Sequence, residues 1–285
     1  MRFAITATDR YLGVFEAFLN AGWKPVKLFT APVDNRMSHN KEVIKKAQTL
    51  EIPIQLSRLQ DIDLEDLKNR GCEILIVASY QWRIGDWGRY LPYAVNFHPS
   101  PLPAGRGPYP LIKAVLDGWD HWGVTCHKLA SKLDAGDILA QERFPLAGDE
   151  CHESIDIKTR LAARKLAARV AARFEPLWHA ASPQGEGSYW KLHSDADRML
   201  DFNQPVADIL RRIRAFGEHE CVARVRDRVV FIRRAIGWQE THDLPPGGVT
   251  LNSTQRLVVT AGDGYIALLE WSVVGPDAQL GKTGR

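Results

Sequence analysis

Short apolar runs alternate with helical patterns through the first half of this chain, and that alternation limits the folds open to it. Residues 74–78 are five consecutive apolar residues, the pattern of a strand buried on both faces. Similar runs predict strands at residues 3–5, 26–29 and 94–97. Helical spacing between them, as at 12–18 and 43–50, predicts βαβ units, hence an α/β fold with a Rossmann-like, mostly parallel sheet. Ligands of such sheets bind at the carboxyl ends of the strands.

The second half of the chain has a different pattern. A stretch rich in Ala, Arg and Leu at 155–178 predicts one long helix. The apolar positions of this helix include Ile155, Leu161, Leu166 and Val170. After a segment of linker composition come one helical pattern, at 206–216, and several short β-rich pieces separated by turn residues. The chain is therefore predicted to contain a large domain at 1–180, a linker at 181–188 and a small β-rich, open-barrel-like domain at 189–285.

Composition and charge argue against several classes of protein. No run of about 18 apolar residues is present, so we expect no membrane-spanning segment. The four cysteines are scattered without a C-x-x-C pair, which favours the reducing cytoplasm. A net charge of +3 is too small to indicate a nucleic-acid-binding protein by itself.

The end of the strand at 94–97 carries the first candidate site residues. Asn96 and His98 are two positions apart on an extended chain, so their side chains lie on the same side. An amide donor and an imidazole on one face can stabilise a developing oxyanion and transfer a proton. Taken alone, the pair is more typical of a strand end whose Asn and His bond to loop carbonyls.

A second candidate segment lies at 123–139. Residues 123–129 alternate like a strand, and Asp134-Ala135-Gly136-Asp137 is a turn before another strand. A lone D-x-G is usually a turn in which the Asp bonds its own backbone. Metal binding is not expected, because His121, Cys126 and His127 do not have the four ligands of a zinc site. Cys151 with His152 falls short in the same way.

Together these segments resemble the 10-formyltetrahydrofolate-dependent formyltransferases, the family of the methionyl-tRNA, glycinamide ribonucleotide and amino-sugar enzymes. The family's N-x-H-x-S motif is matched by residues 96–100, and its D-x-G motif by residues 134–136. Its L-P-x-x-R-G segment is matched by residues 102–107. The resemblance continues through 189–216, which is similar to the start of the carboxyl-terminal domain in the methionyl-tRNA and amino-sugar members. The 1–180 domain is then the catalytic one.

The resemblance implies a catalytic role for three residues. Asn96 is expected to donate its amide to the oxyanion that forms when an amine attacks the formyl carbon. His98, protonated at that moment, is expected to donate a second hydrogen bond. Asp134 is expected to lie beside His98, favour its charged form and help to pass the proton of the amine. Loss of one oxyanion donor typically costs about 3 to 4 kcal/mol.

The resemblance also implies where the folate and the acceptor bind. The folate-binding residues expected from it are Tyr80, Gln81, Trp82, Arg83, Ile84, Leu133, Ala135, Gly136 and Asp137. Trp82 either stacks on the pterin ring or packs against the protein. Ser100 either orients the site or makes a turn bond. Arg106 either contacts an anionic acceptor or is a solvated loop charge.

Charge guides the prediction of the acceptor. Methionyl-tRNA members usually carry a long basic insertion after the second strand, whereas residues 30–40 here include one arginine. Residues 189–285 hold 13 Lys and Arg against 12 Asp and Glu, a balance that gives little sign of a tRNA-binding face. A small-molecule amine, such as an amino-sugar nucleotide or an amino acid derivative, is therefore the expected acceptor. The alternatives are methionyl-tRNA, a hydrolase that uses water instead, and a folate-binding module without turnover.

Overall fold

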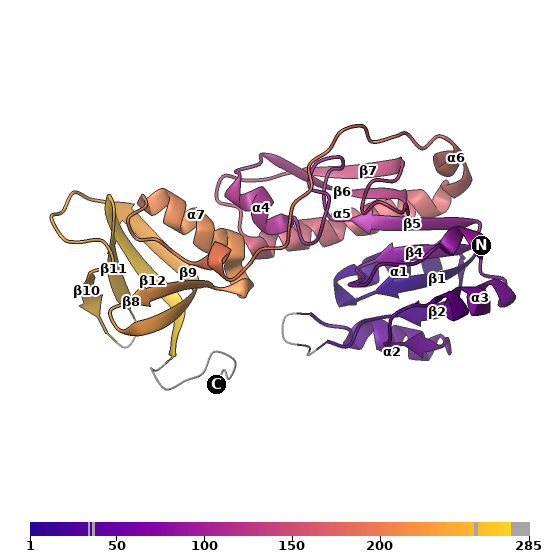
Figure 1. The fold of residues 1–285 in the computed structure, drawn as a ribbon, viewed down its shortest axis with the longest axis horizontal. Helices are drawn as coiled ribbons and strands as arrows, with labels where there is room; N and C mark the ends of the chain where they lie inside the picture. The colour runs from indigo at the N-terminus through magenta and orange to yellow at the C-terminus, as the bar shows by residue number, and fades with distance from the viewer. Residues whose placement is uncertain (34, 36–37, 254–255, 275–285) are drawn as a thin grey trace. The chain divides into compact units, whose positions relative to one another are not determined.

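The computed structural model describes residues 1–33, 35, 38–253 and 256–274, and the chain forms two compact units in it (Figure 1). The first unit comprises residues 1–110, 121–145 and 156–191. The second comprises residues 111–120, 146–155 and the chain from 192 onward.

A seven-stranded sheet forms the centre of the first unit, in the order β3-β2-β1-β4-β5-β6-β7. The first five of these strands along the chain pair in parallel, and β6 and β7 add an antiparallel edge. This confirms the predicted Rossmann-like, mostly parallel sheet. The strands are β1 (Arg2–Ala7), β2 (Lys24–Phe29), β3 (Ile54–Gln55), β4 (Ile74–Ala78), β5 (Tyr93–His98), β6 (His121–Lys128) and β7 (Ile138–Pro145).

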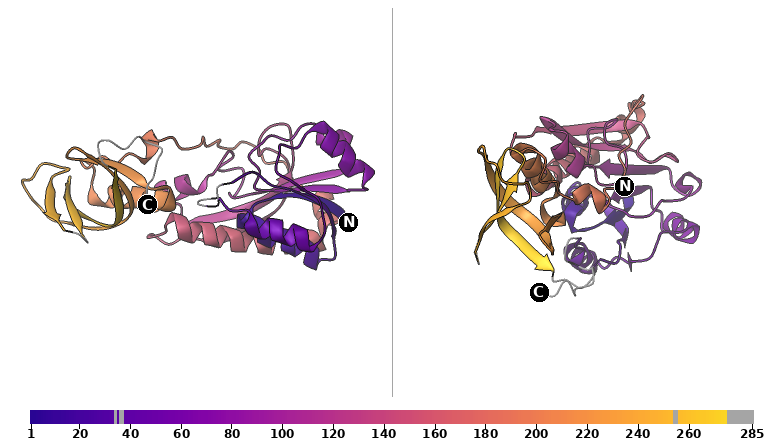
Figure 2. Two further views of the ribbon diagram at one scale, coloured as in Figure 1. Left: turned by 90° about the horizontal axis from the view of Figure 1, so that it is seen from below. Right: turned by 60° about the vertical axis from the view of Figure 1, so that its left-hand side comes forward.

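Helices bury both faces of this sheet (Figure 2). On one face, apolar side chains of α1, α2, α5 and α6 join those of the sheet in a single core. On the other face Leu64 and Leu67 of α3 pack on β1, β2 and β4. The strand β4 is fully buried, as its unbroken apolar run predicts. The helices are α1 (Leu12–Asn20), α2 (Lys41–Thr49), α3 (Asp61–Asn69), α5 (His152–Ala172) and α6 (Phe174–His179).

The long helix predicted at 155–178 is two helices, because α5 ends at Ala172 and α6 begins at Phe174. Pro176 explains the break: it has no N–H to donate to the carbonyl four residues earlier. Leu161, one of the apolar positions of the predicted helix, is 57% exposed. The buried stripe of α5 instead follows Ile155, Leu166 and their neighbours on the same side.

The second unit is built on a five-stranded antiparallel sheet in the order β10-β11-β12-β9-β8, which confirms the predicted small β-rich domain. Helix α7 (Val206–Phe216) covers it with Ile209, Ile213 and Phe216, and the short helix α4 (Leu111–Leu116) packs against α7. The strands are β8 (Cys221–Val225), β9 (Arg228–Gln239), β10 (Val249–Asn252), β11 (Leu257–Ala261) and β12 (Gly264–Val274). Sequence patterns predicted α7 and the β-rich pieces at 222–225, 229–232, 257–260 and 265–269, but neither α4 nor β10.

The units divide the chain differently from the predicted domains. Residues 181–188, expected to be a linker, belong to the first unit, where Ser182 pairs with Ile138 at the start of β7. Their small polar residues resemble a linker in composition, yet their backbone groups bond to the first unit. Residues 111–120 and 146–155, expected in the large domain, belong to the second unit. The boundary along the chain falls after Lys191.

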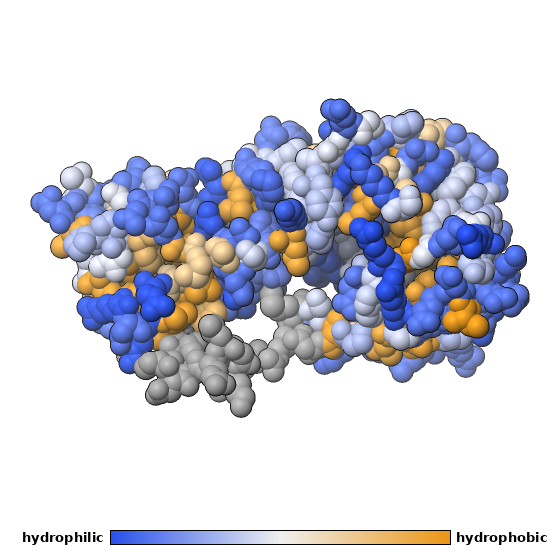
Figure 3. Space-filling view, viewed as in Figure 1, coloured by the Kyte–Doolittle hydropathy of each residue, from blue (hydrophilic) through white to orange (hydrophobic). Residues whose placement is uncertain are grey.

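None of the helices within the described residues is long and apolar enough to cross a membrane. Hydrophilic side chains predominate on the face drawn in Figure 3, with hydrophobic residues scattered between them. All four cysteines are free thiols, and three of them are buried.

Candidate active site

The carboxyl end of β5 brings Asn96 and His98 to one side of the sheet. Antiparallel pairing with β6 sets His127 opposite Asn96, and Thr125 opposite His98. Side chains of directly opposed residues lie on the same face of a sheet. The predicted shared face of Asn96 and His98 therefore also carries His127.

Asp134 reaches this face from the turn between β6 and β7. Its backbone is left-handed, with a φ of 51°, a conformation that Asp tolerates better than most residues. The carboxylate Oδ2 accepts a hydrogen bond of 2.9 Å from the backbone N–H of Gly107. Oδ1 accepts one of 3.1 Å from the side-chain amide of Asn96. The structure thus brings Asp134 into contact with the motif from which 38 positions separate it in the sequence.

Gly136 explains the glycine of the D-x-G motif. A Cβ at this position would lie 1.9 Å from the carbonyl oxygen of Lys128, a distance that no side chain can occupy. The turn therefore packs directly on the backbone at the end of β6. Asp134 can approach β5 only because its neighbour at 136 has no side chain.

His98 is buried, and its two ring nitrogens have different surroundings. Nε2 lies 2.7 Å from the carbonyl oxygen of Gly105, so this nitrogen is an N–H donor. Nδ1 faces Oδ1 of Asp134 at 3.6 Å, beyond a good hydrogen bond. In the neutral imidazole the free lone pair is therefore on Nδ1, on the side of Asp134.

Burial and the neighbouring groups together set the charges of His98 and Asp134. Loss of solvent lowers the pKa of His98 below its ordinary value, although the Asp134 carboxylate and the Gly105 carbonyl oppose the change. Burial acts to raise the pKa of Asp134, but the His127 imidazole, the charge on His98 and the Gly107 N–H together hold it below its ordinary value. Asp134 is ionised at neutral pH beside a neutral His98.

His127 is a site residue that sequence reasoning missed. Its side chain is fully buried. The Nδ1–H group donates to the carbonyl of Lys128 at 2.8 Å. Nε2 lies 3.2 Å from the Asn96 amide nitrogen and 3.7 Å from Oδ1 of Asp134. From the sequence, His127 stood out only as a candidate metal ligand, and that role was not expected for it. Strand alternation at 123–129 was a usable signal, but only together with the register against β5.

The amide of Asn96 differs from its predicted arrangement. One N–H points at Oδ1 of Asp134 and the other at Nε2 of His127, so both donors have protein acceptors. To donate to an oxyanion, as the sequence predicts, Asn96 must exchange one of these partners. Such bonds commonly rearrange when a substrate binds.

Ser100 and Arg106 are held by the protein itself. The Ser100 hydroxyl donates to the carbonyl of Ala104 at 2.7 Å, which is the turn bond that the sequence left as an alternative. Arg106, predicted either to contact an acceptor or to be solvated, is only 7% exposed. Its Nε donates to Gln184 at 3.0 Å and its Nη2 to the Gly185 carbonyl at 3.1 Å. These bonds favour a structural role for Arg106.

The loops expected to hold the folate flank the site. Tyr80 and Trp82, after β4, meet edge to face at 5.2 Å, and the Tyr80 hydroxyl accepts the N–H of Leu59 at 2.7 Å. In the other loop Leu133 is 37% exposed, and Asp137 pairs with Lys128 at 3.2 Å. The remaining positions expected to bind folate are Gln81, Arg83, Ile84, Ala135 and Gly136, of which Gly136 is buried.

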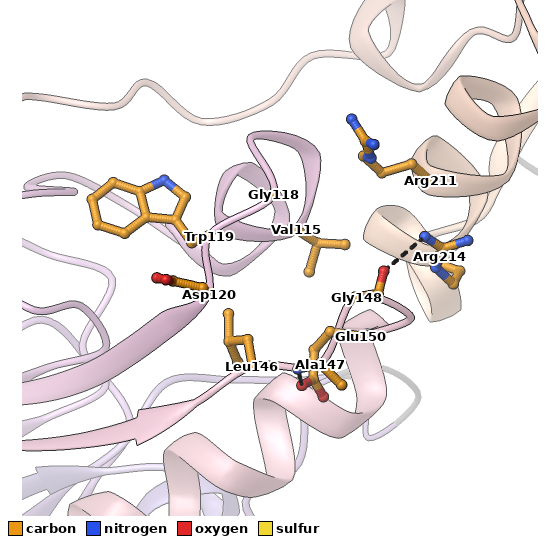
Figure 4. A pocket seen from close by; sticks show the side chains of 10 residues that line it. All are labelled: Val115, Gly118, Trp119, Asp120, Leu146, Ala147, Gly148, Glu150, Arg211 and Arg214. Carbon is orange, nitrogen blue, oxygen red and sulfur yellow. Dashed lines mark hydrogen bonds between the residues drawn. The ribbon is translucent and has the colours of Figure 1, made fainter.

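Metal binding and a cavity in the second unit are the other candidates for a functional site among the described residues. No group of three or more His, Cys, Asp or Glu side chains within the described part of the chain could hold a metal ion. A cavity of about 230 Å³ in the second unit contains none of the candidate residues (Figure 4). Arg211 and Arg214 of α7 line it, and Arg214 donates to the carbonyl of Gly148 at 3.5 Å.

Comparison with known proteins places this geometry in a family. Residues 31–171 match the family described as formyl transferase, and residues 193–277 match its carboxyl-terminal domain. A methionyl-tRNA formyltransferase from Herpetosiphon aurantiacus is 31% identical over 236 residues, which are 80% of this chain and 74% of that protein. The chain belongs to the formyl transferase family. This confirms the resemblance drawn from residues 96–107 and 134–136.

Solved structures share the fold, among them a formyltransferase. The N-formyltransferase from Helicobacter canadensis, solved with folinic acid and dTDP-3-aminofucose, superimposes with a TM-score of 0.70 over 95% of this chain and 99% of its own, at 15% identity. HypX from Aquifex aeolicus gives a TM-score of 0.67 at 19% identity over 94% of this chain. The match spans only 43% of HypX. At these identities the likeness concerns the fold.

Proposed function

We propose that this formyltransferase moves the formyl group of 10-formyltetrahydrofolate to a primary amine, with Asn96, His98 and Asp134 as its catalytic residues. The observation that carries the proposal is the convergence of these side chains at the carboxyl end of β5. Asp134 bonds to Asn96 at 3.1 Å and lies 3.6 Å from His98, all within a family of formyltransferases. Ligands of parallel sheets bind at this edge.

The two flanking loops suit the formyl donor chemically. Tyr80 and Trp82 offer aromatic rings that are half-buried, and Leu133 offers an exposed aliphatic side chain, a combination that accommodates a planar ring. Tyr80, Ile84 and Leu129 pack on the same hydrophobic cluster, which holds the two loops on one part of the sheet. When bound, 10-formyltetrahydrofolate supplies the electrophilic formyl carbon. We propose as its binding residues Tyr80, Gln81, Trp82, Arg83, Ile84, Leu133, Ala135, Gly136 and Asp137.

The reaction forms a C–N bond from the amine to the formyl carbon, breaks the bond from that carbon to the donor nitrogen, and moves one proton between the two nitrogens. Neutral His98 can take this proton at Nδ1, because its Nε2–H is held by Gly105. Asp134 then stabilises the imidazolium until the proton passes to the leaving nitrogen. This differs from the predicted order, in which His98 begins protonated.

Asn96 has the complementary task at the formyl oxygen. As negative charge develops there, its amide can leave one present acceptor and donate to that oxygen. His127 and Asp134 hold the amide plane at the end of β5 until then. Loss of such a donor typically slows a reaction by about 100- to 1000-fold.

The acceptor that we propose is methionyl-tRNA. A curated relative with that activity in its name matches 80% of this chain, which supports tRNA over the ranking drawn from charge. That ranking relied on residues 30–40, of which Asp34, Arg36 and Met37 lie outside the described residues. A small-molecule amine is the second candidate, supported by the 13 basic and 12 acidic residues of 189–285.

An acceptor screen tests the proposal. The protein is incubated with 10-formyltetrahydrofolate and, in separate reactions, methionyl-tRNA, amino-sugar nucleotides and amino acids, and each acceptor is analysed by mass for one added formyl group. We expect formylmethionyl-tRNA. A formylated small amine instead selects the second candidate. Formate release alone, or folate binding without loss of the formyl group, contradicts formyl transfer.

A further inference from the structure

The segment at 182–190 returns from α6 along the loop at 102–107 and the loop at 129–137, although it lies outside every motif. At one end Ser182 pairs with Ile138. At the other, the Ser188 hydroxyl accepts the N–H of Gly105 at 3.1 Å, and the Ser188 carbonyl accepts the N–H of Arg106 at 2.9 Å. Residues 182–190 are therefore bonded to the first unit at both ends.

Gln184, between these ends, connects the two loops with one side-chain amide. Its Nε2 donates to the carbonyl oxygens of Asp134, at 2.8 Å, and Gly136, at 2.6 Å. Its Oε1 accepts from Nε of Arg106 at 3.0 Å. A neutral amide offers two donors and an acceptor in one plane, and all of them are used here.

These bonds hold the backbone that aims the catalytic carboxylate. Asp134 has a left-handed φ of 51°, a conformation that surrounding contacts must maintain. The two amide hydrogens of Gln184 fix the carbonyl groups on either side of Ala135, and Arg106 fixes the opposite end of the amide. The Asp134 side chain has little freedom to turn from His98 while its backbone is held in this way.

We propose that Gln184 is a positioning residue of the active site, holding the Asp134 turn so that its carboxylate faces His98. The inference rests on the proposed function of Asp134 and His98. It assigns to the 182–190 segment a part in catalysis, beyond its packing on the first unit.

Gln184→Glu and Gln184→Leu separate positioning from general stability. Glu keeps the length and an acceptor for Arg106, but sets a carboxylate against the two carbonyls; Leu removes all three bonds. We expect either change to lower kcat by about 100-fold, the usual cost of a misplaced catalytic group. Gln55→Leu is the matched control, because Gln55 is also half-buried and donates to Asp63 at 2.9 Å and to the Arg58 carbonyl at 3.5 Å, neither of which is a proposed site residue.

Titration of His98 by NMR gives a readout that stability alone does not move. The Asp134 carboxylate raises the pKa of His98 against the effect of burial. When the turn is released, the titration midpoint of His98 should fall below its wild-type value in Gln184→Leu, which adds no charge, and stay unchanged in Gln55→Leu. If wild-type protein fails to transfer formyl groups, the proposed function is overturned. The titration midpoints of His98 still test the positioning role, because they need no turnover. Folded Gln184→Leu with wild-type kcat and an unchanged His98 midpoint overturns the positioning role, as does an equal effect of Gln55→Leu.

Discussion

Asp134 is the residue on which the polar contacts of the site converge. Its carboxylate accepts bonds from Asn96 and Gly107 and faces the imidazoles of His98 and His127. A buried carboxylate needs this many partners, because an unpaired charge in the interior is costly. The same partners orient it toward the nitrogen of His98 that can exchange a proton.

His127→Leu tests the residue that the sequence did not reveal. Leu fills a similar volume but provides no acceptor for the Asn96 amide. We expect kcat to fall about tenfold, which corresponds to the loss of one modest hydrogen bond in the transition state. Steady-state kinetics with saturating folate measure it. Unchanged kcat in a folded variant contradicts a role for His127.

The pH dependence of stability tests the state of His98. Its pKa in the folded protein lies below the ordinary value of about 6.5, so the unfolded chain takes up this proton first as pH falls. Stability should therefore decrease from about pH 6.5 downward until pH reaches the lower folded pKa. Denaturant unfolding of wild type and His98→Asn across this range should show the extra loss only in wild type. If the free energy of unfolding falls equally with pH in both proteins, the lowered pKa of His98 is contradicted.

The β5 strand and the turn before β7 show how much of the site follows from local sequence. A period of two was enough to place Asn96 and His98 on one face. The nearness of Asp134 came only from the resemblance, because nothing local relates residue 134 to strand β5. His127 depends on the register of β6 against β5, and a pairing register is not encoded in either strand alone.

Arg106 and the helix at 155–178 show what sequence patterns do not predict when the deciding contacts lie far along the chain or a helical pattern is strong. Arg106 looks like a loop charge until residues 184 and 185 return to bond it. Within the predicted helix, Pro176 indicates a break, but the strong Ala- and Leu-rich pattern around it favoured one continuous helix. The fold class, by contrast, followed from the alternation of strands and helices.

Gly136→Ala tests the close approach of the turn to β6. The new Cβ would lie 1.9 Å from the Lys128 carbonyl, so the turn must move and carry Asp134 with it. We expect a loss of about 1 to 3 kcal/mol in unfolding free energy and about 100-fold in kcat. Gly148→Ala is the control, since no atom lies within 4 Å of its added Cβ. Equal behaviour of the two variants contradicts the account of the turn.

The two units are interleaved along the chain, so they cannot be separated by one cut. Residues 111–120 and 146–155 lie early in the sequence but belong to the unit that contains α7. Helix α4 buries Leu111, Ile112, Ala114 and Val115, and it packs against α7. The carboxyl-terminal part of the chain is therefore needed to complete a fold that begins before residue 120.

A chain truncated after Lys191 tests this interleaving. Without α7, one or two large aliphatic side chains of α4 become exposed, at a cost on the order of 3 kcal/mol. Thermal unfolding should begin at lower temperature, and a dye that binds exposed apolar surface should bind the truncated chain more strongly. A thermal midpoint equal to that of the full chain, with no added dye binding, contradicts the role assigned to α7.

Transfer of a labelled formyl group by wild type, His98→Ala and Asp134→Asn examines the assignment of function as a whole. Each protein receives 10-formyltetrahydrofolate labelled in the formyl carbon, together with methionyl-tRNA, and folate binding is measured in parallel. The label should move to the amine of the acceptor with wild type, and at least about 100-fold more slowly with either variant, while folate binding stays close to wild type. Transfer at the wild-type rate by either variant, or label recovered only as formate from wild type, would contradict the account.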